Sequence, residues 1–150
     1  MAKMKKTMHR YPYSLLVDSG FWFAYYEPRD RFHSQAIEKA VHLENASVLL
    51  PWPSLYETLN TRFVKRPEYI QHFESIAQRP SVVLLDDTPF REDAYRLTWS
   101  MALRGGRPLS LVDMVIRFML DDVNTRIDYM LTFNVQDFHD ICRKHSITML

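Results

Sequence analysis

The sequence predicts an α/β domain: a mainly parallel central sheet of four to five strands with helices on both faces, in three layers. Short apolar runs alternate along the chain with longer segments whose apolar residues recur at helical spacing, a pattern that favours parallel strands joined by helical crossovers. The 150 residues are enough for one such domain with a core. Hydrophobic residues at 47% and charged residues at 25% are typical of a globular chain.

The strands are predicted from apolar runs that are short and bounded by polar residues or proline. Four runs have the length expected of buried strands, and a further run close to residue 150 fits an edge strand. The four strands are predicted at 14–17, 47–50, 81–85 and 127–133, and the edge strand at 147–150.

The helices are predicted from apolar positions three and four residues apart and from capping residues at their starts. Asp30 and Ser110 are residue types that cap helices, and Ser54 with Glu57 three residues later has the spacing of a capping box. The helices are expected at 20–26, 30–44, 54–63, 67–78, 88–104, 110–120 and 138–144.

Composition excludes several classes of protein. The three glycines, Gly20, Gly105 and Gly106, cannot build the glycine-rich loop of a Walker or dinucleotide site, so no nucleotide cofactor is expected. The single Cys142 excludes disulfides and thiolate zinc sites and fits a reducing, cytoplasmic setting. No apolar stretch is long enough for a membrane span. The net charge of +1 gives no overall attraction to nucleic acid, so such a partner would need a local patch.

The chain divides into two parts by composition. Residues 1–13 are expected to form a basic N-terminal arm, since no long apolar region follows them as it would in a secretory signal. Residues 14–150 show no linker or internal repeat, so they are predicted to form a single domain.

Acidic residues follow the predicted strands in a way that suggests a site. Asp18 ends the first strand, Glu57 follows the second, Asp113 lies in the first turn of its helix, and Asp137 follows the fourth strand beside Asn134. The carboxyl ends of parallel strands meet at one edge of a sheet, where such folds bind their ligands. Glu57 and Asp113 also fit purely structural roles at helix N-termini, but Asp18 has no cap to make.

The predicted grouping of acids indicates a site for a divalent cation. Carboxylates that share one site repel one another, and a hard divalent cation removes that repulsion. Mg²⁺ suits an oxygen-only ligand set that leaves room for water and phosphate. Such a site supports phosphodiester hydrolysis, because the metal lowers the pKa of water and stabilises developing negative charge.

The segments around these acids resemble the ordered motifs of PIN-domain ribonucleases. The resemblance runs from residue 14 to residue 150, and its strength lies in the order and spacing of motifs that are each weak alone. The motifs are LLVDS (15–19), DRFH (30–33), PSLYET (53–58), LSLVDM (109–114) and LTFNVQDF (131–138).

The resemblance implies a PIN-like fold and assigns roles to the residues that match the motifs. Asp18, Glu57 and Asp113 match the acidic metal-binding core, and Ser19 matches a hydroxyl position beside the first acid. The fourth position is shared between two candidates. Asp137 is the expected charged catalytic and metal-binding residue, with Asn134 as a neutral ligand or orienting residue, although the long 121–126 segment leaves their register open.

The resemblance also implies a function, since small PIN proteins are most often similar to VapC-type toxins. The expected activity is a Mg²⁺- or Mn²⁺-dependent endoribonuclease that is paired with a cognate antitoxin and forms a homodimer. The alternative is a PIN-fold RNA-binding protein with weak or no nuclease activity, which Asn134 in place of an acid makes plausible. A receiver-like phosphoacceptor domain would need an acid pair before Asp18 and a later strand-end lysine, and the sequence has neither.

Arginines near the acids are candidate phosphate contacts. Arg104 and Arg107 flank the double glycine and are expected on the same edge as the acids, where cations would hold an RNA backbone. A solvated surface is the other interpretation of this pair. For Arg62, Lys65 and Arg66, farther along the chain from Glu57, a solvated charged face is the preferred one.

Overall fold

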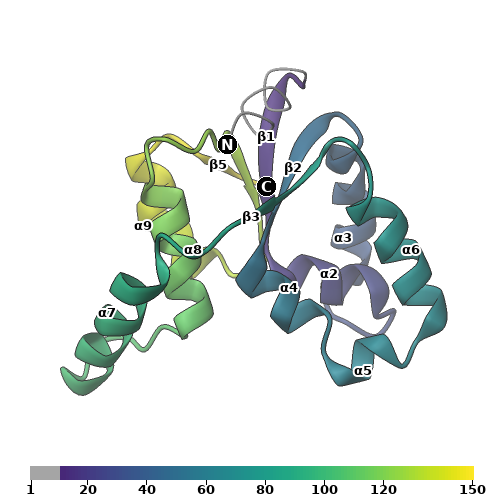
Figure 1. Cartoon of the computed structure of the whole chain (residues 1–150). Helices are drawn as coiled ribbons and strands as arrows, with labels where there is room; N and C mark the ends of the chain where they lie inside the picture. The colour runs from purple at the N-terminus through teal and green to yellow at the C-terminus, as the bar shows by residue number, and fades with distance from the viewer. Residues whose placement is uncertain (1–10) are drawn as a thin grey trace.

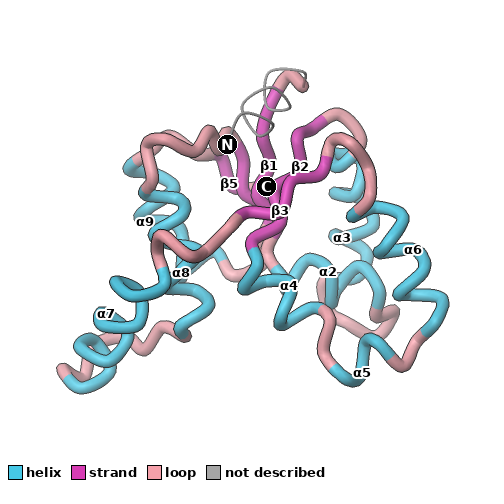
Figure 2. The backbone as a smooth tube through the Cα atoms, in the orientation of Figure 1, coloured by secondary structure: helices cyan, strands magenta, loops and turns pink. Residues whose placement is uncertain are grey.

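The computed structural model describes residues 11–150 and confirms the α/β architecture with a central sheet (Figure 1). The basic arm predicted for residues 1–13 falls almost wholly outside the described residues. Five strands, all parallel, form one sheet in the order β3-β2-β1-β4-β5 (Figure 2). The strands are β1 (Tyr13–Val17), β2 (Ala46–Pro51), β3 (Val82–Leu85), β4 (Tyr129–Leu131) and β5 (Thr148–Met149).

Helices cover both faces of this sheet. α2, α3 and α6 lie on one face, while α8 and α9 lie on the other with α7 packed outside α8 (Figure 1). None of the helices within residues 11–150 is both long and apolar enough to cross a membrane. The helices are α2 (Ser19–Tyr26), α3 (His33–Lys39), a short 3₁₀ turn η1 (Ala40–Leu43), α4 (Trp52–Thr58), α5 (Thr61–Val64), α6 (Pro67–Ala77), α7 (Arg91–Leu103), α8 (Leu111–Asp121) and α9 (Val135–Lys144).

Two apolar clusters hold the layers together, one on each face of the sheet. Successive residues of a strand point to opposite faces, so Leu15 of β1 packs with α2 and α6 whereas Leu16 packs with α8 and α9. Both leucines are fully buried, as expected for a parallel sheet covered on both sides. Most of the 20–26 aromatics belong to the first cluster, among them Phe21 and Trp22.

The predicted helix at 54–63 is wrong in its start and its continuity. It begins at Trp52, with Pro53 in its first turn where the missing N–H of proline does no harm. Ser54 is therefore inside the helix, and its hydroxyl has no hydrogen-bond partner within the described residues. The helix ends at Thr58, and Asn60 caps the separate α5 by accepting from the Phe63 N–H at 3.1 Å.

Smaller boundary differences have local causes. Asp30 does not cap a helix directly, because its carboxylate accepts from the Phe32 N–H in a turn and α3 begins only at His33. The predicted 88–104 helix begins at Arg91, and the fourth strand is limited to Tyr129–Leu131 by its pairing with β1.

The strand order places a ligand site between β1 and β4. The chain moves outward from β1 through β2 to β3, then crosses back to add β4 on the other side of β1. Neighbouring strands whose connections leave in opposite directions form a crevice at their carboxyl ends. Asp18 follows β1 and Asn134 follows β4, so both residues lie at this crevice.

Candidate active site

Asp18 is a buried carboxylate at the end of β1. The expectation that it has no cap to make is wrong, because Asp18 is the N-cap residue of α2. Only 5% of the residue is exposed, and both carboxylate oxygens accept a hydrogen bond, from the Ser19 N–H at 2.8 Å and from the Thr132 hydroxyl at 2.9 Å. Burial raises the pKa of Asp18 to about 6, the charges of Asp113 and Glu57 add to the rise, and the two hydrogen bonds oppose it. The site therefore holds a fixed carboxylate whose negative charge is poorly solvated.

Ser19 and Glu57 connect the first two strand-to-helix junctions. Ser19 begins α2, and its hydroxyl donates to the Glu57 carboxylate at 2.5 Å. Glu57 lies in the last turn of α4, so it does not serve as the capping-box acid that its spacing from Ser54 also suggested. This bond fixes the hydroxyl and the second acid against each other.

Asp113 enters the site from the first turn of α8. The predicted cap is confirmed, since the Asp113 N–H donates to the Ser110 hydroxyl at 3.1 Å. Burial is the largest cause that raises the pKa of Asp113, with the charges of Asp137 and Glu57 contributing and hydrogen bonding with Ser110 opposing. Two neighbouring carboxylates, Asp137 and Glu57, therefore disfavour the charged form of Asp113.

One cavity collects these side chains at the carboxyl edge of the sheet. It has a volume of about 490 Å³. The structure thus brings together five of the predicted site residues from four separate junctions. Its lining residues are Asp18, Ser19, Gly20, Phe23, Glu57, Ser110, Asp113 and Asn134.

The other predicted site residues lie beside this cavity. Asp137, in the first turn of α9, forms an ion pair with Arg107 and accepts a hydrogen bond from the Asn134 side chain. Arg107 is thus occupied by a carboxylate and by the Gln136 carbonyl at 3.3 Å. Arg104 is exposed at the end of α7. Asn134 faces the cavity, whereas Asp137 acts on it through its charge and through Asn134.

The chemistry of the donor set fits a hard divalent cation, because the cavity offers carboxylate, hydroxyl and amide oxygens and no sulfur or imidazole. The ligand side chains, however, lie farther apart than in an assembled metal site. Within residues 11–150, no three His, Cys, Asp or Glu side chains are grouped closely enough to hold a metal ion. Burial is the main cause that raises the pKa of Asp18 and of Asp113, and repulsion from neighbouring carboxylates adds to both rises, from Asp113 and Glu57 on Asp18 and from Asp137 and Glu57 on Asp113.

Thr132 is a site residue that sequence reasoning missed. Its side chain is 1% exposed, donates to Asp18, and accepts from the Asn134 N–H at 3.0 Å. The residue therefore ties the end of β1 to the loop after β4. The available signal was a lone hydroxyl at the end of an apolar strand, two residues before Asn134.

The fold defines the class: the chain has the PIN-like fold seen in VapC toxin structures. No protein-family model and no curated protein matches the sequence. One similar solved structure is VapC20 of Mycobacterium tuberculosis, a toxin that cleaves the sarcin-ricin loop, with a TM-score of 0.59 and 21% identity over 85% of this chain and 95% of that one. Another is VapBC2 from Rickettsia felis bound to a DNA fragment from its promoter, with a TM-score of 0.57 and 12% identity over 91% and 96% of the two chains.

Proposed function

We propose that the protein is a Mg²⁺- or Mn²⁺-dependent endoribonuclease that acts as the toxin of a toxin–antitoxin pair. The observation that carries the proposal is the cavity in which Asp18, Glu57 and Asp113 meet beside the Ser19 hydroxyl. The fold shared with an RNA-cleaving toxin supports RNA as the substrate. The fold shared with a VapBC complex supports an antitoxin as the partner.

Each residue has a distinct role in this proposal. Asp18, Glu57 and Asp113 would hold the cation, with Asn134 or Asp137 completing the set. When bound, the cation would supply a water of lowered pKa and positive charge for the phosphate oxygens. Thr132 and the Ser19 N–H keep the Asp18 carboxylate in one orientation, and the Ser19 hydroxyl does the same for Glu57. The products would carry a 3′-hydroxyl and a 5′-phosphate.

The proposal is tested with protein freed of any co-purified partner and incubated with total cellular RNA in Mg²⁺, in Mn²⁺ or in EDTA. Cleavage is expected with metal and not with EDTA. Asp18→Asn and Asp113→Asn should abolish cleavage and relieve any growth inhibition on expression. Asp93→Asn, which changes an exposed acid of α7, is the matched control and should cleave like the wild type. Equal cleavage by Asp18→Asn and wild type would overturn the catalytic assignment.

The alternative, RNA binding without cleavage, is favoured by one observation: within the described residues, no three acids are gathered as a ready metal site. It predicts RNA affinity that is the same in EDTA and in Mg²⁺, with intact RNA recovered from both. Metal-dependent cleavage that disappears in Asp18→Asn would exclude it.

A further inference from the structure

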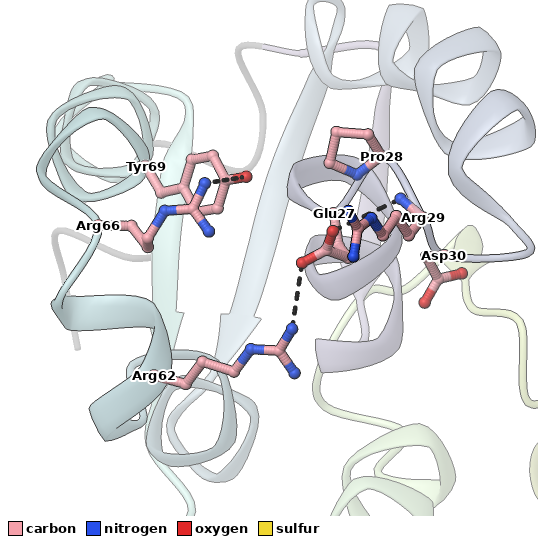
Figure 3. Close-up of a pocket in the computed structure, with 7 residues that line it drawn as sticks. All are labelled: Glu27, Pro28, Arg29, Asp30, Arg62, Arg66 and Tyr69. Carbon is pink, nitrogen blue, oxygen red and sulfur yellow. Dashed lines mark hydrogen bonds and ion pairs between the residues drawn. The ribbon is translucent and has the colours of Figure 1, made fainter.

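A second cavity, here called the arginine cavity, lies between the turn after α2 and the α5–α6 segment. It has a volume of about 510 Å³, and Figure 3 shows Arg62, Arg66 and Tyr69 on one side facing Glu27 and Arg29 on the other. Arg62 and Arg66 are exposed, as the sequence suggested, but they line a hollow and do not simply cover a solvated face. Nothing in the proposed cleavage chemistry uses them.

The arginine cavity and the acidic cavity, the one lined by Asp18, Glu57 and Asp113, are separate hollows related through α2 and the turn that follows it. Phe23 lines the acidic cavity and also a hollow of about 320 Å³ that shares Arg62, Arg66 and Tyr69 with the arginine cavity. Ser19, Phe23 and Glu27 are spaced four residues apart, so they follow one side of the helix. At about 1.5 Å per residue, the distance from Ser19 to Glu27 along the axis is about 12 Å.

α4, α5 and the turn between them also contribute residues to these hollows. Glu57 lines the acidic cavity, whereas Asn60 and Arg62 line the hollow beside Phe23. Two contacts join the α2 segment to the α4–α5 segment, the Ser19–Glu57 hydrogen bond at 2.5 Å and the Arg62–Glu27 ion pair at 3.3 Å. The same two segments therefore carry the acids and the arginines.

The arginines are available to an anionic ligand. The Arg62 side chain is 86% exposed, and an exposed ion pair such as Arg62–Glu27 contributes little free energy, so a phosphate can replace the carboxylate. Arg66 is paired with the exposed Glu68 at 3.1 Å, an ion pair that a phosphate can replace in the same way, and its guanidinium lies 4.3 Å from the centre of the Tyr69 ring and donates to the Tyr69 hydroxyl at 2.9 Å. A planar guanidinium held on an aromatic ring is suited to phosphate and to base stacking.

We propose that the arginine cavity binds the phosphate backbone of the RNA strand that leads away from the acidic cavity. This rests on the proposed function for the identity of the strand. Arg62 and Arg66 contact phosphate, and Tyr69 supports Arg66 and offers its ring edge to a base.

The test measures binding of a short fluorescein-labelled single-stranded RNA in EDTA, which separates binding from cleavage. The Arg62→Ala/Arg66→Ala double variant should bind about tenfold more weakly, and the slope of log K against log salt should fall by about 1.4, since each phosphate contact contributes about 0.7. The matched control is Arg96→Ala, which removes an exposed, ion-paired arginine from α7 and should leave both quantities unchanged. Thermal melting checks that the variants are folded.

The inference would be overturned by no RNA binding by the wild type, by equal binding of the double variant, or by the same loss in Arg96→Ala. A glutamate-rich peptide that binds more tightly than the RNA and is lost in the double variant would also overturn it, in favour of an acidic protein partner. Binding in EDTA with no cleavage in metal would count against the proposed function while leaving this inference intact. If the double variant instead shows metal-dependent cleavage with the same affinity for RNA and the same rate as the wild type, the proposed function stands and this inference fails.

Discussion

Asp18 is an acid at a position where burial disfavours its negative charge. An ordinary aspartate has a pKa of 3.8, and the folded protein raises it to about 6. A folded-state pKa above the unfolded one means that the protonated form stabilises the fold. Below about pH 4 the group brings no penalty, the penalty grows between about pH 4 and pH 6, and it is fully present at neutral pH.

Asp18→Asn should therefore stabilise the protein in EDTA while removing its activity. The amide keeps the shape and removes the buried charge, so the free energy of unfolding at neutral pH should rise by about 1–3 kcal/mol. Urea unfolding at two pH values measures this. The gain should shrink toward zero near pH 4, and a gain that does not depend on pH would contradict the electrostatic explanation.

Thr132 should behave as a positioning residue for Asp18. Thr132→Val keeps the shape but removes the hydrogen bond that lowers the pKa of Asp18. The acidic limb of the pH–rate profile should move to higher pH, and the rate at neutral pH should fall severalfold. Thr132→Ser retains the hydroxyl and should restore both. A purely structural role would predict an unshifted profile with reduced stability, and that result would exclude the positioning role.

At the scale of elements, the break between α4 and α5 shapes both cavities. Asn60 holds it from both sides, because its side-chain oxygen accepts from the Phe63 N–H while its amide donates to the Glu57 carbonyl at 2.9 Å. The turn places Glu57 at the acidic cavity and Arg62 at the arginine cavity. A single continuous helix would not place the two side chains in this way.

Asn60→Ala should destabilise the protein by about 1 kcal/mol, the usual effect of removing a helix cap. Asn60→Asp keeps the accepting oxygen and should lose less. Denaturant unfolding of the three proteins gives the comparison. Equal stability of Asn60→Ala and wild type would show that packing of Phe63 alone holds α5 in place.

The same region shows what the sequence could and could not predict. Asp18, Glu57 and Asp113 were correctly expected to meet, because the rule that brings strand ends to one edge depends only on element order. The helix start at Ser54 was wrong because Pro53 suits a first turn equally well, and packing decided between them. Thr132 was missed since its partner Asp18 is 114 residues away in the sequence, a pairing that no local pattern contains.

At the scale of the whole molecule, an exposed apolar surface lies on the helices that follow β2 and β3. We call it the α4–α7 surface: Trp52, Tyr56, Tyr95, Trp99 and Leu111, each at least 39% exposed. Tyr56, Tyr95 and Leu111 line one hollow there. α7 buries a single residue, Ala94, within the described chain. Large exposed apolar surfaces mark contacts with other proteins, so this is where we expect the predicted homodimer to form.

Trp99→Glu should convert the dimer to monomer, because a twofold interface places the introduced charge twice in one apolar contact. Sedimentation or light scattering measures the change in mass. Val41→Glu is the matched control, since Val41 is also exposed, at 61%, but belongs to η1, whose Leu43 packs in the apolar cluster on the opposite face of the sheet from Ala94 of α7. A monomeric wild type, or a dimer unaffected by Trp99→Glu, would rule out this surface.

The central position of β1 affects when the acidic cavity can be completed during synthesis of the chain. A ribosome completes Asp18 and Glu57 while β4, with Thr132 beyond its end, is still unmade, so the growing chain can pair β1 only with β2. The acids of the first half then lack both the hydroxyl that orients Asp18 and the third carboxylate. The order of synthesis therefore keeps the acidic cavity incomplete until the last quarter of the chain joins the sheet.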